Sequence, residues 1–118
     1  MTLIISPPEK FKGRVSLPGD KSISHRAAII GALARGTTRI KGYANSQDCR
    51  STLNCLRVLG VNIGLDSDVL TIEGREMKLC PPRGDLDAGN SGTTARLMLG
   101  VLAGQPFSAL LTGDRFLK

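Results

Sequence analysis

Two short polar turns in this sequence contain the residue types that bind phosphate or carboxylate groups. One runs from Gly19 to Arg26 and the other from Gly89 to Arg96. In both, the arginine follows the glycine by seven residues, hydroxyl side chains lie between them, and an apolar segment of helical character comes next. A helix start presents unpaired N–H groups and the positive end of a dipole, to which arginine adds a charged pair of donors. The pattern predicts two anion-binding helix starts, and we expect them to line one cleft.

The first turn gathers three donor groups of different kinds. Ser22 and Arg26 lie four residues apart, so they share one face of the predicted helix, and Lys21 immediately precedes them. An ammonium, a hydroxyl and a guanidinium therefore meet at the start of this helix. Such a set suits a ligand that carries more than one negative charge.

The second turn is suited to bind a ligand through its backbone more than through its side chains. Gly89 and Gly92 leave room for a ligand beside the chain, Asn90 and Thr93 add neutral donors, and Arg96 adds a charge. The spacing matches neither GxGxxG nor GxxxxGK[ST], so neither a dinucleotide fold nor a P-loop is indicated. Read without the first turn, this segment equally fits an ordinary capped helix whose glycines serve the turn.

Composition narrows the class of protein. The chain has 118 residues, of which 41% are hydrophobic, and this is typical of one globular domain. It lacks an apolar run long enough to span a membrane and a secretory leader, so we expect a cytoplasmic protein. His25 is the only histidine and the cysteines (Cys49, Cys55 and Cys80) fit no zinc spacing, so we expect reduced thiols and no metal site.

The net charge of +6 lies entirely within residues 1–42. A basic segment is compatible with nucleic acid, with an acidic small molecule or with a solvated surface. The chain has one Tyr, three Phe and no Trp, too few for binding single strands by base stacking, and no basic helix or finger pattern appears. We therefore expect a small polyanionic ligand and no nucleic acid.

Periodicity and turn residues predict the elements that carry the two turns. We expect strands at 3–5, 13–17, 37–41, 61–65, 69–73 and 107–112, with a short strand near Leu86, and helices at 22–34, from about 46 to 59, and at 93–103. Residues 13–73 then spell β-α-β-α-β-β, and the same order begins again at Leu86. The third helix is apolar on most faces, so we expect the chain to be the amino-terminal part of a longer protein. Alone, it should expose apolar surface and associate.

The two turns carry a family resemblance. The segments at 18–27 (PGDKSISHRA) and 86–96 (LDAGNSGTTAR) resemble the two N-terminal signatures of the 3-phosphoshikimate 1-carboxyvinyltransferase (EPSP synthase) family. The similarity extends over essentially the whole chain. It implies an α/β fold of α+β-type repeats, the inside-out α/β barrel of the enolpyruvyl transferases, of which about one and a half β-α-β-α-β-β units are present. The implied organisation is a strand and linker at 1–12, which in the family belongs to the other globule, a first unit at 13–73, a connector at 74–84 and a truncated second unit at 85–118.

The resemblance also implies a reaction. Members of the family transfer the enolpyruvyl group of phosphoenolpyruvate to the 5-hydroxyl of shikimate 3-phosphate, in the shikimate pathway of aromatic amino-acid biosynthesis, without metal or organic cofactor. By position, Lys21 would contact both substrates and act in catalysis, Ser22 and Arg26 would bind shikimate 3-phosphate, and Asn90 and Gly92 would bind phosphoenolpyruvate. Thr93 and Arg96 would support the loop.

Some features depart from the family pattern. Leu97 follows the second arginine, where many members have proline. The phosphoenolpyruvate-binding arginine of the family would fall just beyond Lys118, and the groups from later units are absent. The resemblance therefore implies a chain that is inactive alone, that needs the C-terminal part of the same protein, and that is monomeric at full length. A stand-alone anion-binding module without catalysis remains the alternative.

Overall fold

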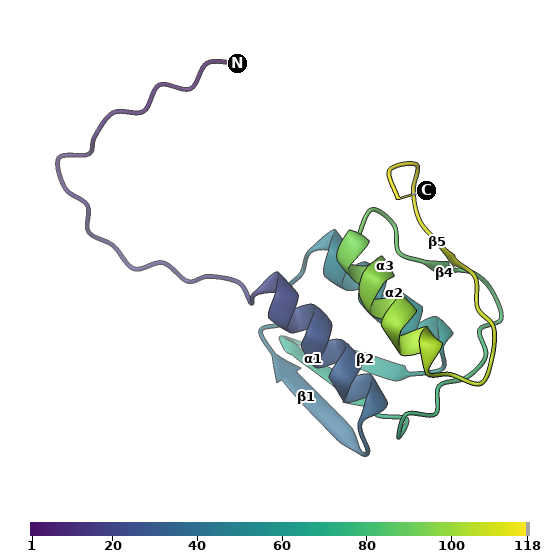
Figure 1. Ribbon diagram of the computed structural model, residues 1–118. Coiled ribbons are helices and arrows are strands. Elements are labelled where there is room, and N and C mark those ends of the chain that lie inside the picture. The colour runs from purple at the N-terminus through teal and green to yellow at the C-terminus, as the bar shows by residue number, and fades with distance from the viewer. Residues whose placement is uncertain (118) are drawn as a thin grey trace.

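The computed structural model describes residues 1–117. These residues form three helices, a three-stranded sheet and a pair of very short strands, which Figure 1 shows in chain order. The elements are α1 (Lys21–Leu33), β1 (Thr37–Lys41), α2 (Gln47–Val58), β2 (Asn62–Asp66), β3 (Val69–Glu73), β4 (Leu86–Asp87), α3 (Gly92–Ala103) and β5 (Leu111–Thr112).

Each helix begins at a polar side chain that caps it. Asp20 accepts a hydrogen bond from the amide of Ile23 in α1, and Ser46 and Ser91 accept the corresponding bonds in α2 and α3. These residues satisfy amides that would otherwise lack partners at a helix start. The predicted helix starts are therefore confirmed to within one or two residues.

The larger sheet is antiparallel throughout, in the order β1-β3-β2. The β2–β3 hairpin turns at Ser67, whose φ of 53° lies in the left-handed region. On the central strand β3, Leu70 and Ile72 are buried while their neighbours are not, the alternation of a sheet with one face covered. The predicted hairpin is confirmed.

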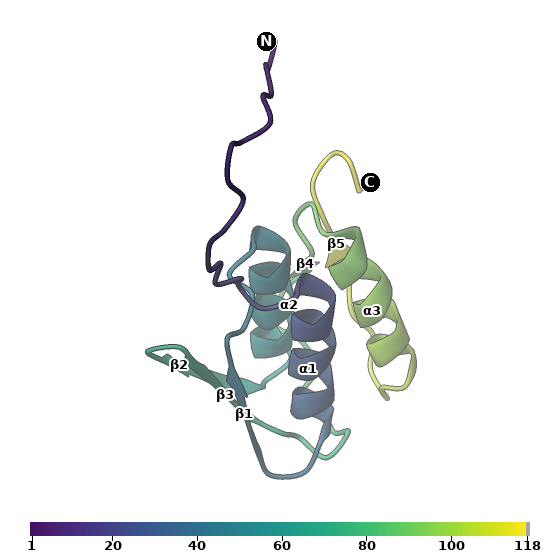
Figure 2. The same cartoon turned by 90° about the vertical axis from the view of Figure 1, so that its left-hand side faces the viewer.

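Two of the helices lie against this sheet, and α3 lies beyond them, on the side away from it (Figure 2). Helices α1 and α2 pack on each other and on the sheet, and α3 packs on α2 (Figures 1 and 2). The largest fully buried core side chains are those of Leu56, Leu59, Leu70, Ile72, Leu86 and Met98. Strands β4 and β5 pair in parallel beside α3, as they would at the start of a second unit.

Two of the predictions for the first eighteen residues are wrong. Residues 3–5 and 13–17 form no strand; they extend away from the body (Figure 1), with Ile4 86% and Leu17 81% exposed. A strand requires a partner for its backbone N–H and C=O groups, and no neighbouring segment in residues 1–117 offers one. The expected strand at 107–112 is also shorter, because only Leu111 and Thr112 pair with β4.

Much of α3 is uncovered. Only Thr94 and Met98 are buried in this helix, and Leu99 is 58% exposed. Helix α1 likewise exposes Ile23 and Ile30, which lie two turns apart. The predicted exposure of apolar surface is confirmed, whereas association of the chain stays a prediction. Within residues 1–117, no helix has the length and apolarity needed to cross a membrane.

Candidate functional site

The first turn is held by close backbone packing before α1. A Cβ atom on Gly19 would collide with the carbonyl oxygen of Gly42, so only glycine lets the two segments approach this closely. Ser24 adds a second tie, since its hydroxyl donates to the carbonyl of Asp20 at 2.7 Å and accepts from the amide of Ala44 at 3.0 Å. The entry to α1 is therefore fixed against the loop that leads into α2.

The second turn is held by glycine geometry and by the segment after β5. Gly89 has a φ of 57°, and its carbonyl accepts from the amide of Asp114 at 2.9 Å. The Nδ2 group of Asn90 donates to Oδ2 of the same aspartate at 2.7 Å. Asn90 is thus oriented by Asp114, whose importance the sequence did not reveal.

The starts of α1 and α3 lie at the same end of the molecule. All three helices run in nearly the same direction and begin at that end (Figures 1 and 2). Asp48, in the first turn of α2, joins the two predicted turns: its Oδ2 atom accepts from Nζ of Lys21 at 2.7 Å, and its carbonyl accepts from the hydroxyl of Thr94 at 3.2 Å. Lys21 and the second turn are therefore near neighbours.

Four backbone amides at this end lack an acceptor among residues 1–117. In α1 the cap occupies the amides of Ile23 and Ser24, which leaves those of Lys21 and Ser22. In α3 the cap occupies the amides of Thr94 and Ala95, which leaves those of Gly92 and Thr93. Unpaired amides at two adjacent helix starts favour anions.

The charged side chains differ in how strongly they are engaged. The hydrogen bond and charge of Asp48 raise the pKa of the Lys21 ammonium, so Lys21 stays charged at neutral pH. Nη1 of Arg26 donates only to the carbonyl of Ser22, at 3.1 Å, as their shared face predicts. A Cβ atom on Gly92 would lie 3.6 Å from Nη2 of Arg96, so this guanidinium folds back over the turn.

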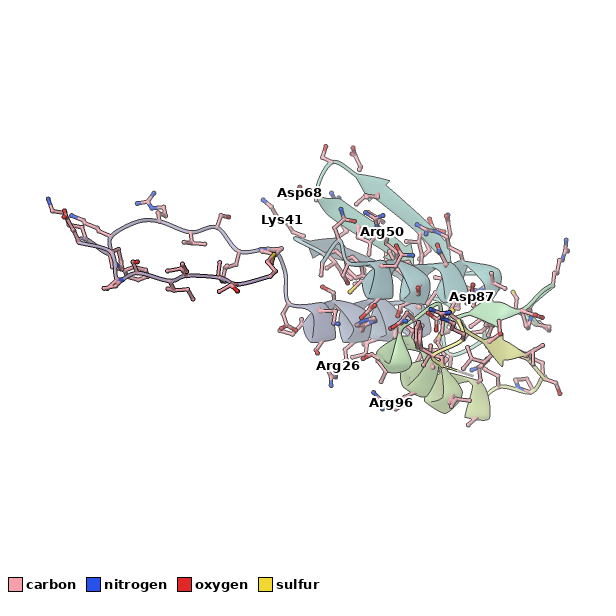
Figure 3. All side chains as sticks on the ribbon, turned by 90° about the horizontal axis from the view of Figure 1, so that it is seen from above. Arg26, Lys41, Arg50, Asp68, Asp87 and Arg96 are labelled. Carbon is pink, nitrogen blue, oxygen red and sulfur yellow. The ribbon has the colours of Figure 1, made fainter. Side chains whose placement is uncertain are left out.

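Figure 3 shows that Arg26 and Arg96 both lie on the side of the helices away from the three-stranded sheet, although they come from α1 and α3. Arg50, by contrast, lies on the sheet side, near Lys41 and Asp68. A cavity of about 440 Å³ lies on that sheet side and is lined by Arg50. No residue of the two turns lines this cavity.

A chain of buried side chains runs beneath the two helix starts. Nδ1 of His25 lies 2.7 Å from Oγ1 of Thr52, which lies 2.8 Å from Oγ1 of Thr94, which lies 2.8 Å from Oγ of Ser91. All four residues are at most 1% exposed. The other ring nitrogen, Nε2 of His25, is buried without a partner among residues 1–117. In the sequence, His25 stands out only as the single histidine.

Burial lowers the pKa of the His25 imidazole, with the charge of Asp48 opposing and those of Lys21 and Arg26 assisting. A lowered pKa in the folded state means that the unfolded chain binds the proton more readily. We therefore expect the free energy of unfolding to be highest above pH about 6.5 and to fall as the pH drops below that ordinary value.

Denaturant unfolding between about pH 7.5 and 5.5 measures this slope. His25→Asn removes the only histidine, so the variant should show much less pH dependence over this range. Equal slopes in the two proteins would contradict a buried neutral imidazole.

Comparison with known proteins places this geometry in a family. The sequence model of EPSP synthase (3-phosphoshikimate 1-carboxyvinyltransferase) matches residues 5–118. The chain belongs to the EPSP synthase family. Among the family's curated members, the 3-phosphoshikimate 1-carboxyvinyltransferase of Desulforamulus reducens is 51% identical over 120 residues, covering 100% of this chain and 28% of the relative. That of Geotalea uraniireducens is 47% identical and covers 99% of this chain and 28% of the relative.

Solved structures of the EPSP synthase family show the same fold. The EPSP synthase from Acinetobacter baumannii superposes with a TM-score of 0.82 at 44% sequence identity, covering 89% of this chain and 24% of that chain. The predicted enolpyruvyl transferase fold is thereby confirmed. The chain spans somewhat over a quarter of the length of its curated relatives.

Proposed function

We propose that this chain supplies part of the substrate site of an EPSP synthase. The complete enzyme would transfer the enolpyruvyl group of phosphoenolpyruvate to the 5-hydroxyl of shikimate 3-phosphate and release phosphate. The observation that supports this most directly is the adjacency of the two helix starts, joined by Lys21, Asp48 and Thr94. Family membership supplies the identity of the two ligands.

In this proposal, Lys21 contacts both substrates and is the catalytic residue. Its ammonium would stabilise charge as the substrates meet, or relay a proton. The remaining assignments are Ser22 and Arg26 to shikimate 3-phosphate, Asn90 and Gly92 to phosphoenolpyruvate, and Thr93 and Arg96 to support of the loop.

The electrostatics favour these ligands. Both substrates carry a phosphate and a carboxylate, so the site must hold several negative charges close together. The four unpaired amides and the cations Lys21, Arg26 and Arg96 offset that repulsion. Asp48 is the opposing charge, and the phosphate of a bound ligand would compete with it for the ammonium of Lys21.

The proposal extends to partners and location. The chain would need the C-terminal part of the same protein for turnover, and the whole enzyme would be a cytoplasmic monomer. It would need neither a metal nor an organic cofactor and would bind no nucleic acid.

Titration of the isotope-labelled chain with shikimate 3-phosphate tests the proposed site. We expect amide chemical shifts to move at Lys21 and Ser22, because a phosphate at the start of α1 approaches their N–H groups, and at Arg26, because its guanidinium binds the same phosphate. Inorganic phosphate serves as the control ligand and should move the same signals at higher concentration. An equal response to both ligands would indicate a simple anion-binding module, and no response at these residues would refute the assignment.

A further inference from the structure

The buried hydrogen bonds that lead from His25 to Ser91 beneath the site run in one direction from donor to acceptor. The carbonyl of Asp48 can only accept, and the single hydroxyl proton of Thr94 is directed to that carbonyl or to Ser91. Thr94 must then accept from Thr52, and Thr52 must accept from the ring of His25. The proton of the neutral imidazole therefore lies on Nδ1.

Two observations disfavour hydrogen bonds that run the opposite way, from Thr94 to His25. If Thr94 donated to Thr52 and Thr52 to His25, the ring proton would lie on Nε2, which is buried without an acceptor. A buried N–H without a partner is costlier and rarer than a buried lone pair. Thr94 would also have no proton left to donate to the carbonyl of Asp48. Both arguments give the same tautomer.

The row of hydrogen-bonded side chains from His25 to Ser91 spans all three helices. His25 lies in the second turn of α1, Thr52 in the second turn of α2, and Thr94 in the first turn of α3. Thr52 is the only link through α2 in this chain, since both of its neighbours bond to it. At the far end, Ser91 is the cap of α3 and directly precedes the unpaired amides of Gly92 and Thr93.

We propose that His25, Thr52 and Thr94 are positioning residues that hold the start of α1 at a fixed distance from the start of α3. This inference depends on the proposed function, because it assumes that the two helix starts bind the two substrates. None of the three side chains needs to touch a ligand. They act by keeping Lys21 and Gly92 at the spacing that two adjacent anions require.

The first test reads the tautomer from the ¹⁵N shifts of the His25 ring at neutral pH, in the unsubstituted chain. We expect a protonated Nδ1 and an unprotonated Nε2. A proton on Nε2 would overturn the proposal, because the chain of donors would then run the other way. This measurement does not depend on any variant folding.

The second test removes the hydroxyl of Thr52 with little change in the volume of the side chain. Thr52→Val should weaken the binding of shikimate 3-phosphate and of phosphoenolpyruvate by roughly fivefold to tenfold each, because the hydrogen bonds of Thr52 to His25 and Thr94 are lost. Thr52→Ser keeps the hydroxyl and should restore both affinities to within about twofold. Thr71→Val makes the same change on β3, away from the site, and should alter neither affinity.

Amide hydrogen exchange separates this proposal from the proposed function. In Thr52→Val we expect faster exchange at Ser24 and Thr94, near the starts of α1 and α3, with the end of α2 at Leu56 unchanged. Uniform loss of protection, or unchanged affinity for both ligands, would overturn the positioning role. If the unsubstituted chain bound neither ligand, the proposed function would fail, and the exchange pattern would still decide the positioning role.

Discussion

Lys21→Ala should abolish most of the turnover of the enzyme completed by its C-terminal part. The expected loss in kcat is on the order of 10²- to 10³-fold, as for removal of one preorganised group that stabilises charge in a transition state. The structure gives the reason, since the charged ammonium of Lys21 lies at the start of α1 and Asp48 joins it to Thr94 at the start of α3. Steady-state kinetics with both substrates measure the change.

The control for this variant is a lysine with a similar setting elsewhere. Lys41 is exposed and lies 3.9 Å from the carboxylate of Asp68, on the sheet side of the molecule. Lys41→Ala should therefore leave kcat within about twofold, because a surface ion pair contributes little. Retention of more than about a tenth of the turnover in Lys21→Ala would contradict a catalytic role.

Asp48→Asn distinguishes the role of the Lys21 ammonium from that of its ion pair with Asp48. This change removes the carboxylate charge but keeps the backbone carbonyl that accepts from Thr94. The pKa of Lys21 should then move back toward its ordinary value, which still leaves the group charged at neutral pH. If Lys21→Ala acted only by breaking this ion pair, Asp48→Asn would show the same loss of turnover.

Local patterns in the sequence predicted the elements that depend on local interactions. Strands β1 and β3 have the predicted bounds, because alternation and turn residues mark them within a few positions. The helix predicted from about 46 to 59 is α2, whose cap is Ser46. The two anion-binding turns were found in the same way, from glycine, hydroxyl and arginine spacing.

Contacts between distant segments escaped the sequence analysis. No sequence pattern singled out Asp48, although its carboxylate and its backbone carbonyl join Lys21 to Thr94. Thr52 gave no signal at all, because a threonine inside an amphipathic helix is unremarkable until its neighbours are known. The strand predicted at 13–17 failed for a related reason: its alternation is real, but pairing needs a partner that residues 1–117 do not provide.

Gly92→Ala should weaken phosphoenolpyruvate binding without harming the fold. The added Cβ would meet only Arg96 at 3.6 Å and Leu117 at 3.8 Å, which is ordinary contact. Alanine also suits the first residue of a helix, so the free energy of unfolding should stay within about 0.5 kcal/mol or rise. A ligand placed against the unpaired amide of Gly92 would, however, meet the new methyl group.

The expected loss of phosphoenolpyruvate affinity is about tenfold to a hundredfold, the cost of forcing one methyl group into a close contact. Affinity for shikimate 3-phosphate should change much less, because its assigned contacts lie on α1. Titration of the labelled chain with each ligand measures both values, and denaturant unfolding measures stability.

Gly100→Ala is the matched control, because it makes the same change in the same helix. A Cβ at this position would meet nothing within 4 Å, so only the helical propensity should change. This variant should be stabilised and should bind both ligands as the unsubstituted chain does. If Gly92→Ala also bound phosphoenolpyruvate normally, the ligand could not lie against the start of α3. The substrate would then have to bind without the amides at the start of α3, and the proposed role of the two adjacent helix starts would be refuted.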